Sequence, residues 1–253
     1  MSAVERHAHA SSSFDAKLEE TTALLRQAAS DYAPLSAGSA PRVCQASSLG
    51  AEDVVLSHLI NSLQLDIGIF VLQTGTLHAE TLDLLARFNA NSRVPVDVFA
   101  PRDHSVIEFV AREGQDAMYR SVMLRKACCQ IRKLEPLERA LTGKDGWITG
   151  LRREQSGARS GVPLVDATDP ARFKLNPLAN WTWGDVWHFI ARHQVDYNPL
   201  HDQFYPSVGC APCTRAISLG EDFRAGRWWW EDEAAKECGL HVHQANTDEK
   251  ATA

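Results

Sequence analysis

Hydrophobic residues along this chain fall into short apolar runs that alternate with longer segments of helical spacing. The runs are short enough for buried strands and cover residues 42–46, 66–72 and 95–100. Each run precedes a segment whose apolar residues recur every three or four positions, over residues 54–60, 81–88 and 104–112. Strands that alternate with helices in this way predict an α/β fold, with a mostly parallel sheet flanked by helices.

The remaining segments extend this pattern. Residues 1–16 have nothing periodic to bury and predict a flexible tail, and residues 16–32 predict a surface helix. A longer helix is expected from residue 126 to residue 141, with Pro136 kinking it or marking its true start. Another strand is expected at 147–150, and residues 182–185 resemble a capping box ahead of a helix.

Loops that follow the predicted strands carry residues suited to an anion. Ligands of such sheets bind beyond the carboxyl ends of the strands, where residues 47–53 and 73–75 both lie. The first loop precedes a helix whose free N–H groups can face an anion, although an ordinary turn with serine as N-cap explains the same residues. The loop after the strand at 147–150 carries Arg152, Arg153 and Arg159, and guanidinium groups bind phosphate or sulfate oxygens in a bidentate fork. The alternative for this loop is a solvated charged surface.

Composition narrows the class of protein. A chain of 253 residues that is 44% hydrophobic can form one large domain or two small ones, and its net charge of −6 argues against a protein that coats nucleic acid. No stretch approaches the roughly 20 apolar residues of a membrane span, and no apolar run near residue 1 resembles a secretory signal. We therefore expect a cytoplasmic protein, in which grouped cysteines are metal ligands or catalytic thiols more often than disulfides.

Four of the six cysteines form two pairs about 80 residues apart, Cys128 with Cys129 and Cys210 with Cys213. Such pairs suit zinc or an iron-sulfur centre that joins two parts of a fold. Neighbouring helix residues point about 100° apart, so adjacent cysteines bind one centre only if it is bulky or the backbone bends. This favours a cluster over a single zinc ion. The cationic residues around the first pair would offset four thiolates: Lys126, Arg132 and Lys133.

Other residues near the end of the chain also suggest chemistry. Cys238 lies among polar residues beside Gly239, so we expect an accessible thiol, the alternative being an incidental exposed cysteine. Arg224 and Arg227 are spaced one helical turn apart and could present one basic face. Cationic neighbours would lower the thiol pKa from its ordinary value of about 8.5. We interpret His201 as a structural loop residue.

The combination of motifs resembles the assimilatory sulfonucleotide reductases, specifically the iron-sulfur adenylylsulfate reductases that use thioredoxin. The two cysteine pairs, the loop at residues 150–157 and the terminal residues 237–241 carry the resemblance. It implies an adenine nucleotide alpha hydrolase-like fold, a modified pyrophosphatase-loop fold, with residues 47–53 as the remnant phosphate loop. One departure is Gln73, where the family usually has aspartate.

The resemblance also implies an activity and a division of the chain. The expected reaction is reduction of adenylylsulfate to sulfite and AMP by reduced thioredoxin or a glutaredoxin-like donor, through an enzyme S-sulfocysteine, in sulfate assimilation and cysteine biosynthesis. After the tail, a nucleotide-binding reductase domain with the iron-sulfur site is expected over residues 17–220. A mobile segment with the catalytic cysteine is expected over residues 221–253. Members of this family are often homo-oligomers, and no nucleic acid or membrane partner is expected.

Individual roles follow from the same resemblance. One 4Fe-4S cluster is expected on Cys128, Cys129, Cys210 and Cys213. The catalytic residues are Cys238 and Lys133, which lies between cluster and substrate, with His241 as a weaker candidate. Arg159, Arg224 and Arg227 are expected to hold the phosphosulfate group. The other expected substrate-binding residues are Ser47, Ser48, Gly50, Glu52, Asp53, Thr74, Gly75, Gly150 and Arg152.

Three other functions remain open at this stage. One is reduction of 3′-phosphoadenylylsulfate, although enzymes specific for that substrate typically lack the cysteine pairs. Another is a cluster-containing tRNA-thiolating enzyme of the pyrophosphatase-loop type, whose Ser-Gly-Gly-x-Asp-Ser loop and basic surface are absent here. The last is a non-catalytic zinc or cluster module that binds a partner through residues 228–230, which adjacent cysteines and an accessible Cys238 fit poorly.

Overall fold

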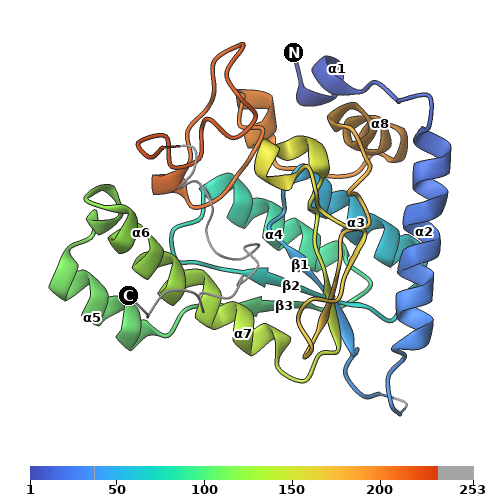
Figure 1. The fold of residues 1–253 in the computed structure, drawn as a ribbon, viewed down its shortest axis with the longest axis horizontal. Helices are drawn as coiled ribbons and strands as arrows, with labels where there is room; N and C mark the ends of the chain where they lie inside the picture. Colours follow the sequence, from blue (N-terminus) through green and yellow to red (C-terminus); the bar gives the residue numbers. More distant parts are fainter. Residues whose placement is uncertain (37, 233–253) are drawn as a thin grey trace, which may run out of the picture.

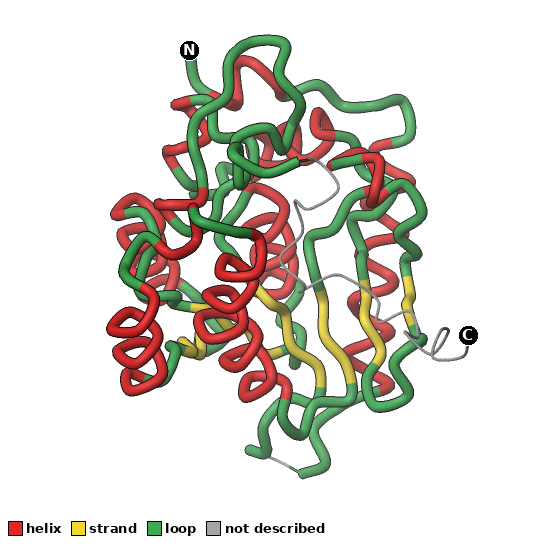
Figure 2. The backbone as a smooth tube through the Cα atoms, turned by 60° about the vertical axis from the view of Figure 1, so that its left-hand side comes forward, coloured by secondary structure: helices red, strands yellow, loops and turns green. Residues whose placement is uncertain are grey.

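The computed structural model describes residues 1–36 and 38–232 and contains a six-stranded sheet at its centre (Figures 1 and 2). The strand order is β3-β2-β1-β4-β6-β5. The parallel strands are β1 Val43–Ser47, β2 Gly68–Leu72, β3 Val96–Phe99, β4 Gly146–Ile148 and β6 Phe173–Leu175. The short strand β5, Val165–Asp166, pairs antiparallel with β6. The predicted α/β class with a mostly parallel sheet is confirmed.

Helices cover both faces of this sheet. The α-helices are α1 Ala3–His7, α2 Phe14–Asp31, α3 Ala51–Ser62, α4 Ala79–Asn91, α5 Asp103–Glu113, α6 Val122–Cys129, α7 Glu135–Leu141 and α8 Trp183–His193. Short turns of 3₁₀ helix lie at Ala117–Tyr119, Arg153–Gln155, Gly157–Arg159, Pro199–Gln203 and Ala211–Cys213. In Figure 1, α5 and α6 lie at the opposite side of the molecule from α2. Among the residues described, no helix is both long and apolar enough to span a membrane.

Alternation along the strands explains why both faces are covered. Val43 in β1 and Ile69 in β2 belong to a core built with α2, α3, α4 and α8. Their neighbours Cys44 and Phe70 point to the other face, where they pack against Leu137 and its neighbours in α7. Because successive side chains of a strand point to opposite faces, a strand apolar at nearly every position is buried on both sides.

The first residues of the chain, where the sequence predicts a flexible tail, include a short helix, α1. Ser2 caps α1 through a capping box, and Ala3 is 1% exposed. The His7 ring lies against Trp183 and Trp187 of α8. The Ala3 N–H also donates to Asp202 at 2.6 Å. Tertiary contacts thus hold a segment that has too little periodicity of its own to predict a helix.

The helix expected over residues 126–141 is divided by a change of helix type. After α6 ends at Cys129, residues Gln130–Leu134 form a π-helical turn, and α7 begins at Glu135 with Pro136 in its first turn. Of the two predicted roles for Pro136, a kink within the helix or the start of a helix, the structure shows the second. Single π-helical turns occur frequently at functional sites, and this one follows the adjacent cysteines directly.

Candidate active site

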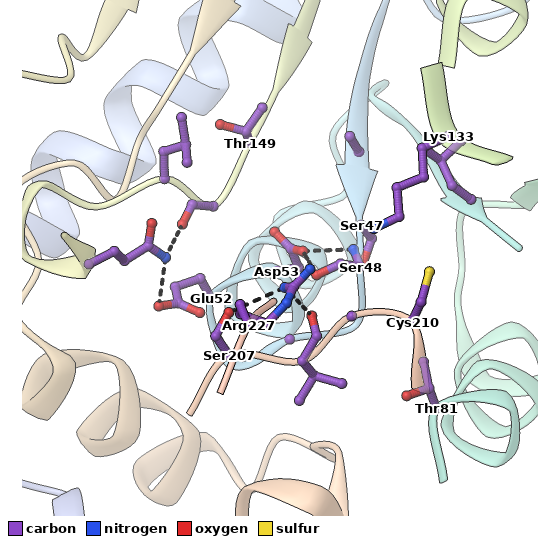
Figure 3. A pocket seen from close by; sticks show the side chains of 18 of the residues that line it. Ser47, Ser48, Glu52, Asp53, Thr81, Lys133, Thr149, Ser207, Cys210 and Arg227 are labelled. Atoms are coloured by element: carbon purple, nitrogen blue, oxygen red, sulfur yellow. Dashed lines mark hydrogen bonds between the residues drawn. The ribbon is translucent and has the colours of Figure 1, made fainter. Parts of the chain in front are cut away.

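A cavity of about 200 Å³ lies at the carboxyl ends of β1, β2 and β4 (Figure 3). Its walls include the loops that follow these three strands, together with residues of the segments at 206–210 and 223–228. The strands are parallel and adjacent, so their terminal loops meet at one edge of the sheet. The predicted place for a ligand is therefore where the structure has its cavity.

The loop after β1 is closed by an aspartate of its own helix. Leu49 adopts a left-handed conformation with φ of 59°, which costs a non-glycine residue roughly 1–2 kcal/mol. Both the N–H and the hydroxyl of Ser48 donate to Asp53 Oδ2 at 2.7 Å. The N-cap of α3 is Gly50 rather than a serine. Burial raises the pKa of Asp53 to about 6, although the bonds from Ser48 oppose the shift.

Gly150 permits the β4 loop to approach this aspartate. A Cβ atom at residue 150 would lie 2.5 Å from Asp53 Oδ1 and 2.8 Å from the Cβ of Glu52. Real Cβ atoms essentially never come that close to another heavy atom. Glycine at this position therefore allows the loops after β1 and β4 to form one wall of the cavity.

Two arginines of the β4 loop have different roles. Arg159 lines the cavity, and its Nη1 donates to Gln155 Oε1 at 2.7 Å. Arg152 has no exposed surface and pairs with Glu52 at 2.8 Å, outside the cavity lining. Gln155 links the two sides, because its Nε2 donates to Glu52 Oε1 at 3.0 Å.

Arg224 and Arg227 line the same cavity, although neither lies on a helix. Arg227 packs against the backbone of Gly209, where a Cβ would lie 2.4 Å from the guanidinium. One guanidinium nitrogen, Nη1, donates to the Val208 carbonyl at 3.2 Å. Its Nε is buried and has no hydrogen-bond partner among the described residues. An unsatisfied buried donor of a cation fits an anionic ligand oxygen, because such a group costs free energy until it is bonded.

The four paired cysteines line a second, smaller cavity. The Ala211 N–H donates to the Thr76 carbonyl at 2.7 Å, and Leu77 forms an isolated antiparallel β-bridge with Cys210. The loop after β2 therefore positions the second pair. The first pair ends α6, immediately before the π-helical turn. Two stretches distant in sequence thus converge on one small cavity.

Cationic side chains surround these thiols. Arg125 hydrogen bonds Cys129 and Arg132 hydrogen bonds Cys128. Burial raises the pKa of Cys210, but Lys133, hydrogen bonds with Thr74 and Thr76, and Arg227 outweigh burial, so that its pKa is below the ordinary value. Burial and the neighbouring Cys210 raise the pKa of Cys213 to about 12. Exposed Lys126 is the one cation of the predicted set that does not line this cavity.

The thiols alone do not form a site for a single metal ion. Over the described ranges, no three or more His, Cys, Asp or Glu side chains are arranged to hold one ion. A structural zinc ion needs four ligands within about 2.3 Å of its centre. Four thiols from two chain segments line one small cavity and cations neighbour both pairs, a donor set of the kind that holds iron-sulfur centres.

Three residues line both cavities: Lys133, Cys210 and Trp228. Lys133 extends from the π-helical turn, and Figure 3 shows its side chain on the same side of the pocket as Cys210. Electrostatic interaction with Lys133 lowers the pKa values of Cys210, Cys213 and Cys128. The anion-suited cavity and the cysteine cavity are therefore adjacent, with a lysine at their boundary.

Most predicted substrate-binding residues line the larger cavity: Ser47, Ser48, Gly50, Glu52, Asp53, Thr74, Gly150, Arg159, Arg224 and Arg227. Gly75 and Arg152 do not. Cys238 and His241 lie outside the described residues. In place of the expected aspartate, Gln73 accepts a hydrogen bond from the Gly75 N–H through its side-chain oxygen.

Several residues of the site were not predicted to belong to it. Arg125 precedes Cys129 by four residues on one helix, a spacing that places two side chains on one face. His201 lines the larger cavity besides packing against Trp187. Gln155 lies in the loop at 150–157 and Trp228 in the segment 228–230, but the sequence did not predict their places in the site, which depend on partners distant in the chain.

Comparison with known proteins identifies the family. The model of the phosphoadenosine phosphosulfate reductase domain matches residues 42–216, a range that includes both cysteine pairs. The chain belongs to this reductase family. The family expected from the sequence is thereby confirmed.

Curated relatives of this reductase cover most of its length. It is 52% identical over 198 residues to the adenosine 5′-phosphosulfate reductase of Allochromatium vinosum, which covers 78% of this chain and 77% of the relative. The corresponding protein of Burkholderia cepacia is 49% identical over 229 residues, covering 90% of this chain and 88% of that protein.

Solved structures agree on the fold of this reductase. A phosphoadenylyl-sulfate reductase from Candida auris, crystallised with phosphate, aligns with a TM-score of 0.59 at 21% identity, covering 80% of this chain and 97% of that chain. The FMN adenylyltransferase of Candida glabrata, in complex with FAD and pyrophosphate, aligns with a TM-score of 0.56 at 13% identity, covering 90% and 80%. At these identities the likeness concerns the fold alone.

Proposed function

We propose that this protein reduces adenylylsulfate to sulfite and AMP, as a cytoplasmic enzyme that takes two electrons from a dithiol protein of the thioredoxin type. The observation that carries the proposal is the boundary between the two cavities. Lys133 and Cys210 line both the cavity with three arginines and the cavity with four cysteines. The relatives named adenosine 5′-phosphosulfate reductase support adenylylsulfate as the substrate.

The larger cavity suits a nucleotide with an anionic end. Arg159 and Arg227 are each less than one-tenth exposed, and Arg227 Nε has no partner among the described residues. Guanidinium groups that have already been desolvated bind sulfate and phosphate oxygens without a further cost of burying the cation. We assign the phosphosulfate to the arginine side and the nucleoside to the loops after β1 and β2.

In the smaller cavity, Cys128, Cys129, Cys210 and Cys213 would hold a 4Fe-4S cluster. When bound, that cluster would supply a fixed charge beside the substrate cavity. Arg125 and Arg132 hydrogen bond the first pair and would help to balance the thiolates. Iron and sulfide contents of about four each per chain would support this assignment, and zinc in their place would contradict it.

The proposed chemistry takes place on Cys238. Its thiolate attacks the sulfate sulfur of adenylylsulfate, an S–S bond forms, and the bond between sulfur and the phosphate oxygen breaks to release AMP. Lys133 and Arg159 would stabilise the negative charge that develops on the departing phosphate. A thiolate of the reduced donor then attacks the Cys238 sulfur and releases sulfite. The second donor thiol resolves the mixed disulfide, so the donor leaves oxidised by two electrons.

Sulfite release under anaerobic conditions tests the proposal. Adenylylsulfate and 3′-phosphoadenylylsulfate are compared as substrates with reduced thioredoxin as donor. We expect faster turnover of adenylylsulfate and no release by Cys238→Ala. Cys44→Ala serves as the matched control, since Cys44 is a buried thiol outside both cavities whose pKa burial raises to about 12. Sulfite release by Cys238→Ala at the wild-type rate would contradict the mechanism, and preference for the 3′-phosphorylated compound would contradict the substrate.

A further inference from the structure

A buried ion pair joins the helix of the first cysteine pair to the last described part of the chain. Arg125 of α6 and Glu231 meet in a bidentate arrangement, with Nε to Oε1 at 2.9 Å and Nη2 to Oε2 at 2.7 Å. Their side chains are 0% and 2% exposed. Beyond the hydrogen bond from Arg125 to Cys129, the proposed mechanism gives this pair no role.

Stability alone does not account for this pair. Removing two charges from water costs about as much free energy as their attraction contributes, and replacing such a pair by apolar residues of similar volume often leaves stability unchanged. A bidentate arginine–carboxylate pair has a directional geometry that apolar contacts lack. Such a pair fixes the position of one segment relative to another.

The Arg125 guanidinium is also part of the wall of the cysteine cavity. It hydrogen bonds the Cys129 thiol and lies 4.6 Å from the ring centre of Trp228. The guanidinium of Arg227 also lies against the Trp228 ring, at 4.7 Å. The backbone N–H of Trp228 donates to the Cys213 carbonyl at 3.1 Å. The φ angle of Trp228 is 42°, which is unusual for a bulky residue.

Glu231 therefore ends a segment whose position depends on the cysteine cavity. Its side chain is buried, whereas the next residue, Asp232, is exposed. Cys238 follows Glu231 by seven residues, which span at most about 25 Å when extended. Fixing the start of so short a tether raises the effective concentration of its thiol at the substrate.

We propose that the pair of Arg125 and Glu231 anchors the terminal segment to the cysteine cavity, so that both act as positioning residues for Cys238. This inference rests on the proposed function. It predicts that loss of the pair slows transfer of the sulfo group to Cys238 while leaving nucleotide affinity and cluster content unchanged.

Full-length Glu231→Gln, which keeps the side-chain volume, tests the proposal. The matched control is Glu221→Gln, which breaks a bidentate pair with Arg215 nearby on the surface. Glu231→Asp keeps the charge but shortens the side chain, and it provides a second variant. Each protein is reacted once with adenylylsulfate, and S-sulfonated Cys238 is followed by intact mass. AMP affinity and iron content are measured on the same samples.

Limited trypsin digestion gives a readout that does not depend on activity. Arg227 is 7% exposed, so cleavage after it should be slow while the segment is anchored. We expect Glu231→Gln to be cleaved there at least about tenfold faster and to form S-sulfocysteine at least about tenfold more slowly. AMP affinity should stay within about twofold of wild type. Glu231→Asp should change both rates in the same directions, and Glu221→Gln should match wild type.

Two results would overturn the inference. One is a Glu231→Gln protein that is sulfonated at the wild-type rate and remains protected at Arg227. The other is a fall in the rate of sulfonation that is no larger than the accompanying fall in iron content, because the pair would then support the cysteine cavity and not the terminal segment. A wild-type protein that forms no S-sulfocysteine would contradict the proposed function, while the digestion would still decide whether the pair anchors the segment.

Discussion

Gln155 accepts a 2.7 Å hydrogen bond from Arg159. The same carboxamide donates to Glu52 at 3.0 Å and to the Gly150 carbonyl at 3.3 Å. The donors and acceptors around it determine the orientation of the amide, so that its oxygen faces the arginine. Gln155 therefore holds Arg159 against the wall of the cavity.

Replacing Gln155 should weaken substrate binding more than turnover. In Gln155→Leu the guanidinium loses an acceptor, and hydrogen bonds to charged groups contribute about 1.5–3 kcal/mol. We expect the KM for adenylylsulfate to rise roughly 10- to 100-fold, with a smaller change in kcat. Steady-state kinetics measure both, and Gln115→Leu, at an exposed loop position, is the control. An unchanged KM would show that Arg159 needs no support from this residue.

Gly150 should not tolerate a side chain. Because the Cβ of Gly150→Ala would lie 2.5 Å from Asp53 Oδ1, the loops after β1 and β4 must separate. Overpacking of this kind costs about 1–3 kcal/mol of unfolding free energy. Denaturant titration measures the cost, with Gly157→Ala as the control, since a Cβ there meets no atom within 4 Å. Equal stability of the two variants would refute the close packing.

Asp53 should make stability depend on pH in a defined direction. Its pKa is raised to about 6 from an ordinary value of 3.8, so its contribution is present below about pH 3.8 and is lost as pH rises through 6. Between pH 4 and pH 7, wild type should lose on the order of 3 kcal/mol of unfolding free energy relative to Asp53→Asn. Parallel stability curves for the two proteins would be inconsistent with a raised pKa.

Asp185 should contribute to stability in the opposite pH direction. It accepts hydrogen bonds from Lys17 and from the Ser11 N–H, both at 2.7 Å. Burial raises its pKa, but these bonds and those of the Thr182 cap outweigh burial and lower the pKa to about 2. Its contribution is therefore present above about pH 3.8 and is lost as pH falls toward 2.

At pH 7, Asp185→Asn should reduce the unfolding free energy by about 1–3 kcal/mol. Asp196→Asn provides the control, because Asp196 pairs with Arg87 on the surface and its side chain is 58% exposed. Exposed ion pairs contribute at most about 1 kcal/mol. Thermal or denaturant unfolding compares the two, and an equal loss from both would show that burial does not strengthen the Asp185 contacts.

Periodicity predicted the elements that carry their own pattern. The runs at residues 42–46, 66–72 and 95–100 became β1, β2 and β3, because strands buried on both faces are apolar at nearly every position. Strands β5 and β6 have two and three residues, too few to show any period. The order of the strands, and hence which loops meet at the cavity, follows from pairing between distant segments.

Residue type and spacing also predicted the chemistry of the cysteine pairs and of the arginine-rich loop. They could not decide which arginine faces a ligand: Arg159 lines the cavity, whereas Arg152 is buried against Glu52. That difference arises because burial of a cation requires a partner, and the partner lies 100 residues away in sequence. The resemblance predicted Lys133 between cluster and substrate, and Lys133 lines both cavities. The tertiary structure alone decided that Arg125 meets Glu231, since this contact depends on segments that only folding brings together.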